Sequence, residues 1–204
     1  MKGFIICTLL HLGAFSCGYG QDQFEGKVVY LPVESQEISS TAKEQAPMKV
    51  VVRAKGSQVR WDEFTEKGSR SIITDFAVNE QFVLIEFLGT LCAIETPKEQ
   101  CAIASEEITE GKKHGKMMDQ KCLSISIDNN QIVWIPGMIL KHPFLPNVNG
   151  IPTEFWHKTA QGKVLYRAIS VIYETQSERF FTIPEEYAKV KADELSSLFN
   201  LTSQ

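Results

Sequence analysis

Short alternations of apolar and polar residues, separated by turn residues, run along most of this chain. Residues 121–127 alternate most clearly, because Leu123, Ile125 and Ile127 share one side and Cys122 and two serines share the other. A period of two is that of a β-strand with one face against a core. The pattern therefore predicts a mainly β protein.

Turn residues divide the chain into short predicted strands. These are residues 24–30, 48–54, 58–65, 71–76, 81–88, 91–95, 121–127, 131–135, 153–157 and 163–175. Gly-containing turns between short strands are typical of an antiparallel meander. Residues 128–130, Asp-Asn-Asn, suit a tight turn, so residues 121–135 are predicted to form a central hairpin.

Three segments depart from this pattern. Residues 97–110 are rich in Ala, Glu and Ile and are expected to hold a turn or two of helix. Residues 136–152 are apolar without a period, so we expect them to cover an apolar surface as a loop. Thr182 to Glu185 has the form of a helix capping box, and a helix is predicted to follow it and close one face of the sheet. Its apolar stripe is Tyr187, Val190, Leu195, Leu198 and Phe199.

The N-terminus has the pattern of an export signal. Lys2 precedes an apolar stretch over residues 4–15 that is too short to span a bilayer, and signal peptidase cleavage after Gly20 is expected. The alternative is processing at a degraded lipobox, with lipidation of Cys17. Both routes predict an exported protein, in the periplasm or associated with the outer membrane, with residues 21–204 forming a single domain.

Charge and cysteine content narrow the classes further. The formal net charge of −4 argues against nucleic acid and against electrostatic docking on anionic membranes. Cys92, Cys101 and Cys122 remain after export, and Cys92 and Cys101 are close enough in sequence for a disulfide. Three unpaired buried thiols are the alternative.

The sequence carries no pattern of an active site. Its histidines are isolated, it has no Cys-x-x-Cys pair, and it lacks a Gly-x-Ser-x-Gly elbow or a phosphate-binding glycine loop. Adjacent glutamate pairs point apart on a strand or helix and do not converge on one substrate. We therefore expect no catalytic residue, metal or cofactor, and the chain is predicted not to be an enzyme.

The order of several short motifs is similar to that of a known family. They are Phe24-x-Gly26, Met48-Lys49-Val50 leading to Gly56-x-x-Val59-Arg60-Trp61, Gly115 and Cys122 with six residues between them, Val133-Trp134, Asn149-Gly150-Ile151-Pro152, and Phe181-Thr182-Ile183-Pro184-x-x-Tyr187. The chain resembles the DUF4412 family of exported bacterial proteins and, more distantly, the GLPGLI family. Both are similar in architecture to the LolA/LolB lipoprotein carriers.

The resemblance implies a strongly curved antiparallel sheet, an open half-barrel of α+β class with a C-terminal helix and a helical or loop cover. The concave face of such a sheet can receive an acyl chain. The residues expected to line it are Val50, Val52, Val59, Trp61, Ile73 and Trp134.

Two functions follow from these expectations. The first is an envelope carrier that binds a lipid or a lipoprotein acyl chain, which requires an apolar cavity open to solvent. The second is a non-catalytic interaction module, with a filled concave face and an exposed apolar patch or sheet edge outside. A thiol enzyme is a third alternative and requires an accessible cysteine of low pKa.

Overall fold

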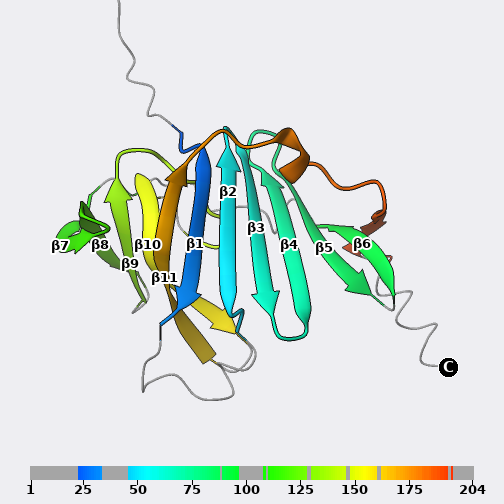
Figure 1. Ribbon diagram of the computed structural model, residues 1–204, viewed down its shortest axis with the longest axis horizontal. Coiled ribbons are helices and arrows are strands. Elements are labelled where there is room, and N and C mark those ends of the chain that lie inside the picture. The colour runs from blue at the N-terminus through cyan, green and yellow to red at the C-terminus, as the bar shows by residue number, and fades with distance from the viewer. Residues whose placement is uncertain are drawn as a thin grey trace, which may run out of the picture.

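The computed structural model describes residues 23–33, 46–87, 89–96, 108, 110–127, 130–145, 148–159, 162–192 and 194. Twelve strands of these residues form one sheet (Figure 1). The strands are β1 (Gly26–Pro32), β2 (Lys49–Lys55), β3 (Gln58–Thr65), β4 (Gly68–Asp75), β5 (Glu80–Phe87), β6 (Thr90–Glu95), β7 (Lys112–Met117), β8 (Gln120–Ile127), β9 (Asn130–Pro136), β10 (Gly150–Thr159), β11 (Gly162–Tyr173) and β12 (Ala188–Lys191).

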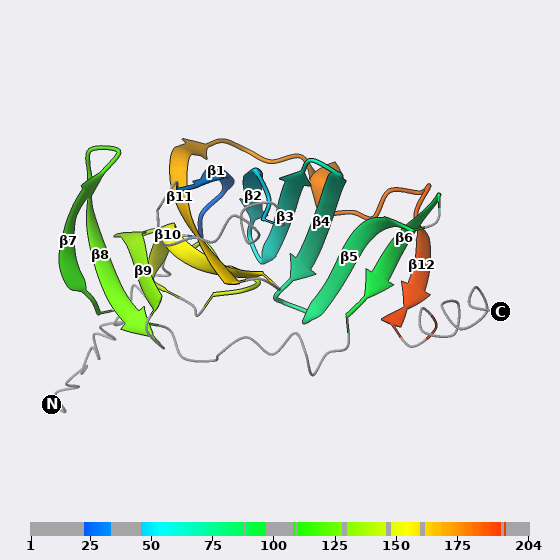
Figure 2. The ribbon, with the colours of Figure 1, turned by 90° about the horizontal axis from the view of Figure 1, so that it is seen from below.

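Two antiparallel meanders build the sheet. Its strand order is β12-β6-β5-β4-β3-β2-β1-β11-β10-β9-β8-β7, so the meander β1 to β6 joins the meander β7 to β11 where β1 pairs with β11. Figure 2 shows the strands following a bent path, with β7 at one end and β12 at the other. The sheet does not close, and the prediction of a mainly β, open curved sheet is confirmed.

Alternation along each strand separates two faces of the sheet. Val50, Trp61 and Tyr30 lie on what we name the inner face, whereas Arg53, Arg60 and Asp62 lie on the outer face. The largest core cluster is on the inner face, where the side chains of Tyr30, Val50 and Trp61 are fully buried. Burying a large apolar side chain contributes about 1.5–3 kcal/mol, which explains why the central strands keep this register.

The predicted C-terminal helix is wrong over residues 182–191. Residues 182–187 form turns and bends, and β12 then pairs with β6 as the parallel pair of the sheet. Ile183 and Tyr187 pack instead against the outer-face cluster of Ile73, Leu84 and Ala93. The gain from this packing and from pairing the edge of β6 outweighs the local capping signal, because helix propensity is a weak preference.

The described helical structure is slight. It consists of the 3-10 helix η2 (Glu178–Phe180) and residues 192 and 194. Among the described residues, no helix is long and apolar enough to cross a membrane. The expected stripe residues Leu195, Leu198 and Phe199 lie outside the described residues, as does most of the segment 97–110.

Candidate functional site

The inner face of the sheet holds four of the six residues predicted to line a ligand site. Val50 and Val52 of β2 and Val59 and Trp61 of β3 belong to the main core cluster, and each is at most 1% exposed. The rings of Tyr30, Phe155 and Tyr166 complete this surface. Trp61 lies 5.8 Å from Phe155, which stacks on Tyr166 at 5.9 Å between ring centroids.

The loop between β9 and β10 closes this face, as the sequence predicts for residues 136–152. Leu140, His142 and Leu145 of the loop are buried against the sheet. The loop is held by hydrogen bonds from the Phe24 N–H to the Ile139 carbonyl, at 2.9 Å, and from the Leu140 N–H to the Gly150 carbonyl, at 3.1 Å. The side chains that were expected to line a cavity therefore form a packed core beneath the loop.

Ile73 does not share the inner face. Trp61 of β3 pairs with Ile72 of β4, and Ile73 pairs with Arg60, so Ile73 points to the outer face. There it packs with Leu84 and Ala93.

Trp134 lies apart from the other predicted lining residues. It belongs to a separate cluster with Ile132 and Val148 near the β8–β9 end of the sheet. Its indole is held between two glycines, since a Cβ added at Gly111 or at Gly150 would lie 2.4 Å from an indole carbon. No described residue accepts a hydrogen bond from its buried Nε1.

A buried carboxylate on the inner face is a site that sequence reasoning missed. Glu63 Oε1 accepts a hydrogen bond from Trp61 Nε1 at 2.8 Å, and Glu63 Oε2 accepts two from Arg70, at 2.7 and 3.0 Å. His157 Nε2 lies 3.9 Å from Glu63 Oε1. The sequence contains a signal for this site. Glu63 is two residues from Trp61 in an alternating strand, so the two side chains lie on the same, buried face.

His142 and His157 lie beside this carboxylate. Burial, together with the neighbouring His157, lowers the pKa of His142 to about 3. Burial also lowers the pKa of His157, and Arg70 lowers it further against the opposing effect of Glu63. Both rings are therefore neutral at pH 7. His142 Nδ1 accepts a hydrogen bond from the Phe144 N–H at 3.1 Å, while its buried Nε2 has no partner among the described residues.

The two core tyrosines are structural. The Tyr30 hydroxyl donates to the Pro152 carbonyl at 2.8 Å, and the Tyr166 hydroxyl donates to the Pro47 carbonyl at 2.6 Å. Burial raises the pKa of both phenols far above its usual range. Both hydroxyls thus stay protonated; the Tyr30 hydroxyl ties β1 to β10, and the Tyr166 hydroxyl ties β11 to the residues before β2.

The described cysteines do not meet the requirements of a reactive thiol. Cys92 and Cys122 are buried free thiols, and burial raises the pKa of Cys122. A thiol of raised pKa is a poor nucleophile at neutral pH. Cys17 and Cys101 lie outside the described residues, so lipidation of Cys17 and pairing of Cys92 with Cys101 stay predictions. No group of three metal-ligating side chains occurs within the described ranges.

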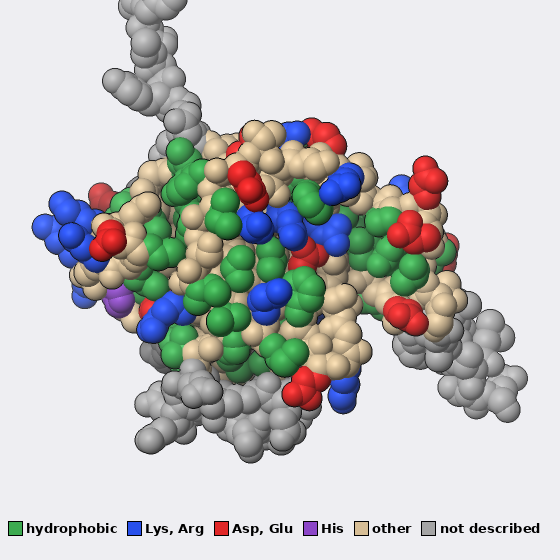
Figure 3. Space-filling model, in the orientation of Figure 1, with side chains coloured by type: hydrophobic (Ala, Val, Ile, Leu, Met, Phe, Trp, Pro, Cys, Tyr) green, Lys and Arg blue, Asp and Glu red, His purple; other side chains and the backbone are tan. Residues whose placement is uncertain are grey.

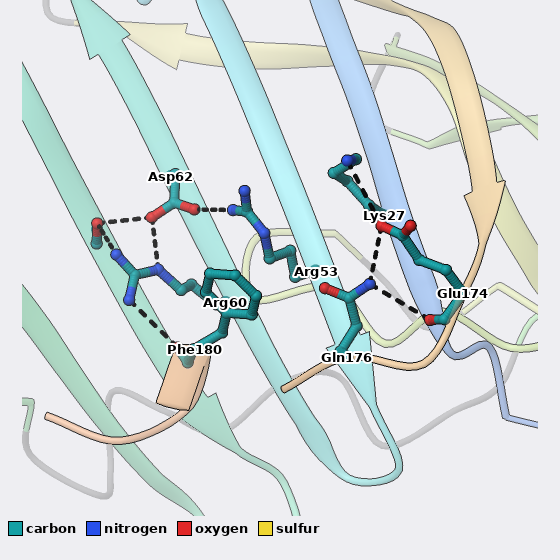
Figure 4. Close-up of polar contacts among 8 residues, drawn as sticks. Lys27, Arg53, Arg60, Asp62, Glu174, Gln176 and Phe180 are labelled. Carbon is teal, nitrogen blue, oxygen red and sulfur yellow. Dashed lines mark hydrogen bonds and ion pairs between the residues drawn. The ribbon is translucent and has the colours of Figure 1, made fainter. Parts of the chain in front are cut away.

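The outer face carries a network of charged groups that ties a C-terminal segment to the sheet. Asp62 pairs with Arg53 and Arg60, and Arg60 also donates to the Phe180 carbonyl at 3.2 Å (Figure 4). The Arg53 guanidinium lies 4.7 Å from the centroid of the Phe180 ring. Residues 174–187, which we name the strap, are thereby fixed across β1 to β4 before the chain enters β12.

Beside the strap, the outer face of β1, β2 and β11 presents an apolar patch. Val29 pairs with Val51 and with Ser170, and Leu31 and Ile172 lie on the same face by register. Ile169, at the bulge of β11, is 55% exposed, and Leu31 and Ile172 are more than a third exposed. Figure 3 shows apolar side chains on this face among Lys and Arg side chains. We name Val29, Leu31, Val51, Ile169 and Ile172 the outer patch, in which Val51 is buried and Leu31, Ile169 and Ile172 are exposed.

Two open clefts lie away from the inner-face core, and the first of them has the predicted lining residue Ile73 in its wall. One, of about 330 Å³, is bounded by the strap and by β4 and β5, with Asp75, Phe82 and Lys189 in its wall. Burial opposes ionisation of Asp75, but hydrogen bonds from the Ala77 N–H, Ser57 and Gln58 outweigh it and lower its pKa. The other, of about 570 Å³, lies along β8 between Gly111 and Gln131. Both clefts mix polar and apolar walls and are open to solvent.

Comparison with known proteins shows the fold alone. No family model and no curated protein matches this chain. Seven solved chains match it in fold, among them one described as "Structure of PNGF-II in C2 space group". That match has a TM-score of 0.50 and 10% sequence identity, and it covers 85% of this chain but 32% of the other. The chain thus spans about a third of the length of the protein it matches.

Proposed function

We propose that this chain is an exported, non-catalytic interaction module of the cell envelope, the second of the two functions expected from its sequence. In this proposal the curved sheet is a rigid support rather than a container, and lipidation of Cys17 is a means of retaining it at a membrane. The outer patch is the surface that meets a protein partner.

The packed inner face is the observation that carries this proposal. A carrier of acyl chains needs an open apolar cavity, whereas Trp61, Val50 and Val52 are fully buried beneath the loop that contains Leu140. Admitting an acyl chain there would require that loop to leave, which would expose the buried His142 and Leu145 to water. The cost of re-exposing these side chains opposes uptake of a ligand.

The outer patch supports the second half of the proposal. Soluble proteins rarely leave contiguous β-branched and leucine side chains in water on a rigid sheet. A patch with aliphatic residues at its centre and charged residues around it has the composition of a protein interface, in which an apolar core is surrounded by a polar rim. Arg53 and Lys27 lie at its border and are themselves paired with Asp62 and Glu174.

Native mass spectrometry of the mature protein, purified from the envelope of its own host, tests the filled core. We expect the bare polypeptide mass, with or without a lipid increment at Cys17. A co-purifying lipid-sized mass that is lost on denaturation would refute the module and favour the carrier.

Photo-crosslinking in the host tests the outer patch. A photoreactive residue at Ile169 should give one discrete adduct, and Ile172→Glu in the same chain should reduce its yield at least tenfold. Val78 is a matched control position, because it is 52% exposed, against 55% for Ile169, but stands alone in the turn after β4. Equal adducts at both positions, or none at Ile169, would contradict an interface at the outer patch.

A further inference from the structure

The β7–β8 hairpin concentrates positive charge in an otherwise acidic chain. Residues 112–127 contain four lysines and a single acidic residue, Asp119, a net of +3, while the whole chain carries −4. Lys112, Lys113, Lys116 and Lys121 are all exposed, and none makes an ion pair with a described residue. Figure 3 shows Lys and Arg side chains gathered at the end of the molecule that Figure 1 assigns to β7 and β8.

The register places three of these lysines on one face of the hairpin. Lys116 lies directly opposite Lys121, and Lys113 lies opposite Leu123, two residues further along β8. A bulge between Lys113 and Gly115 brings Lys113 and Lys116 to the same side. Like charges directly opposite each other in an antiparallel pair destabilise it, so this arrangement opposes folding.

The turn at the tip of the hairpin is also unfavourable for stability. Met118 and Asp119 both have positive φ, 49° and 62°, in the region that favours Gly or Asn. Met118 is 40% exposed at the tip. A two-residue hairpin turn requires positive φ at both central residues, which Asp tolerates, so the residue that this turn does not favour is the exposed Met118. Strain of this kind is typical of functional positions.

We propose that the β7–β8 hairpin docks on an anionic bilayer surface, with its lysines against the headgroups and Met118 in the interfacial layer. Flexible ammonium groups suit diffuse phosphate charge, and each lysine close to an anionic bilayer strengthens binding by about fivefold. An exposed apolar residue at a basic tip adds the second, non-electrostatic attachment that stable interfacial binding needs.

The bulge and the lysines of β7 also disfavour an extended peptide as the partner of this hairpin. Strand addition needs an unbroken row of backbone groups along the free edge, and the bulge between Lys113 and Gly115 interrupts that row in β7. Exposed lysines and bulges are devices that keep other strands off a sheet edge. The hairpin is therefore protected against strand pairing while it remains open to a charged surface.

Vesicle co-sedimentation tests this proposal, using the unlipidated mature chain beginning at Gln21, which contains every described residue. We expect binding to vesicles of phosphatidylcholine mixed with phosphatidylglycerol, no binding to phosphatidylcholine alone, and a loss of affinity as salt is raised. Lys113→Glu/Lys116→Glu should weaken binding more than 20-fold, and Met118→Ser should weaken it several-fold. Inorganic phosphate at constant ionic strength should not compete.

A charge-matched variant keeps the test specific. Lys189→Glu/Lys191→Glu makes the same change in net charge, on exposed residues of β12 at the opposite end of the sheet, and should change the affinity less than threefold. Equal losses in the two double variants, or no preference of the wild-type chain for anionic vesicles, would overturn the proposal. Circular dichroism establishes that each variant is folded. The crosslink at Ile169 does not depend on this hairpin, so the two proposals fail independently.

Discussion

Acidification should destabilise this protein through His142, well above the pH at which its carboxylates titrate. His142 is fully enclosed by Trp61 and Phe155, at 4.7 and 5.1 Å between ring centroids, and its pKa is about 3. An unfolded histidine has a pKa of about 6.5, so between these values the unfolded chain binds a proton that the folded chain does not. Stability therefore rises with pH across this window and falls as pH drops from about 6.5 towards 3.

The magnitude follows from the linkage relation. One proton taken up only by the unfolded chain changes the free energy of unfolding by about 1.4 kcal/mol per pH unit. Between pH 7.5 and pH 5 the loss from His142 is about 2 kcal/mol, a large fraction of the 5–15 kcal/mol typical of a domain. His157 adds to the loss in the same direction, because its pKa is also lowered. The other titratable or charged groups that face the pair are Glu63, Arg70 and Tyr166.

Urea unfolding at pH 7.5, 6 and 5, followed by tryptophan fluorescence, measures this dependence. The wild-type free energy of unfolding should fall by at least about 2 kcal/mol between pH 7.5 and pH 5. His142→Phe keeps an aromatic ring in the site and removes the titrating group, so its curve should be flatter by about that amount. His114→Phe, at an exposed histidine, is the control for the same substitution outside the core. A slope equal in His142→Phe and the wild type would refute the assignment.

Two further predictions concern parts of the fold that the sequence did not reveal. Arg70→Met should lower the free energy of unfolding in urea by about 1–2 kcal/mol, because the buried Glu63 loses its hydrogen bonds from Arg70. Glu63→Gln should then lower the free energy of unfolding less in the Arg70→Met background than in the wild type. Val190→Pro should lower hydrogen-exchange protection of residues 90–95 at least tenfold, whereas Lys189→Pro should not. The Lys191 N–H donates to the Glu194 side chain and so points away from β6. Backbone N–H groups alternate in direction along a strand, so the Lys189 N–H also points away and the Val190 N–H faces β6.

The strands were predictable because their cause is local. Alternation and turn residues identify β8 and β9 almost to the residue, since each strand needs one apolar face and the turn needs short polar side chains. Strand β7 is not predicted from the sequence, because its residues, KKHGKM, form no apolar face. It becomes a strand only because β8 offers it a partner, which a local pattern does not record.

The structure places the predicted lining residues on different surfaces, and strand register is one reason. Ile72 and Ile73 are adjacent and equally apolar, so the sequence does not tell which of them joins Trp61 on the inner face. Pairing of β3 with β4 settles the choice in favour of Ile72. Trp134 lies apart for a different reason. Its strand, β9, is separated from the central strands by β10 and β11. Alternation predicts which face a side chain is on, but not where its strand lies along a bent sheet.

The C-terminal segment shows a local signal overruled by distant partners. Thr182 to Glu185 fits a helix start in isolation, yet Ile183 and Tyr187 gain more by packing on the outer face of β4, β5 and β6. The edge of β6 also offers backbone groups that β12 satisfies. Neither partner lies within 80 residues of the segment in sequence, which is why a window of local residues predicted the other structure.

The proposed docking of the hairpin departs from the expectation drawn from net charge, because charge acts over a limited distance. Exposed charges farther apart than about 8–10 Å are largely screened at physiological salt, so a surface responds to the charges nearest to it and not to the total. The acidic remainder of the chain therefore need not cancel the lysines of the β7–β8 hairpin at a bilayer. With the inner face filled, the two proposed contact surfaces are solvent-exposed ones, the outer patch and this hairpin. If both proposals hold, the hairpin would orient the outer patch relative to the membrane.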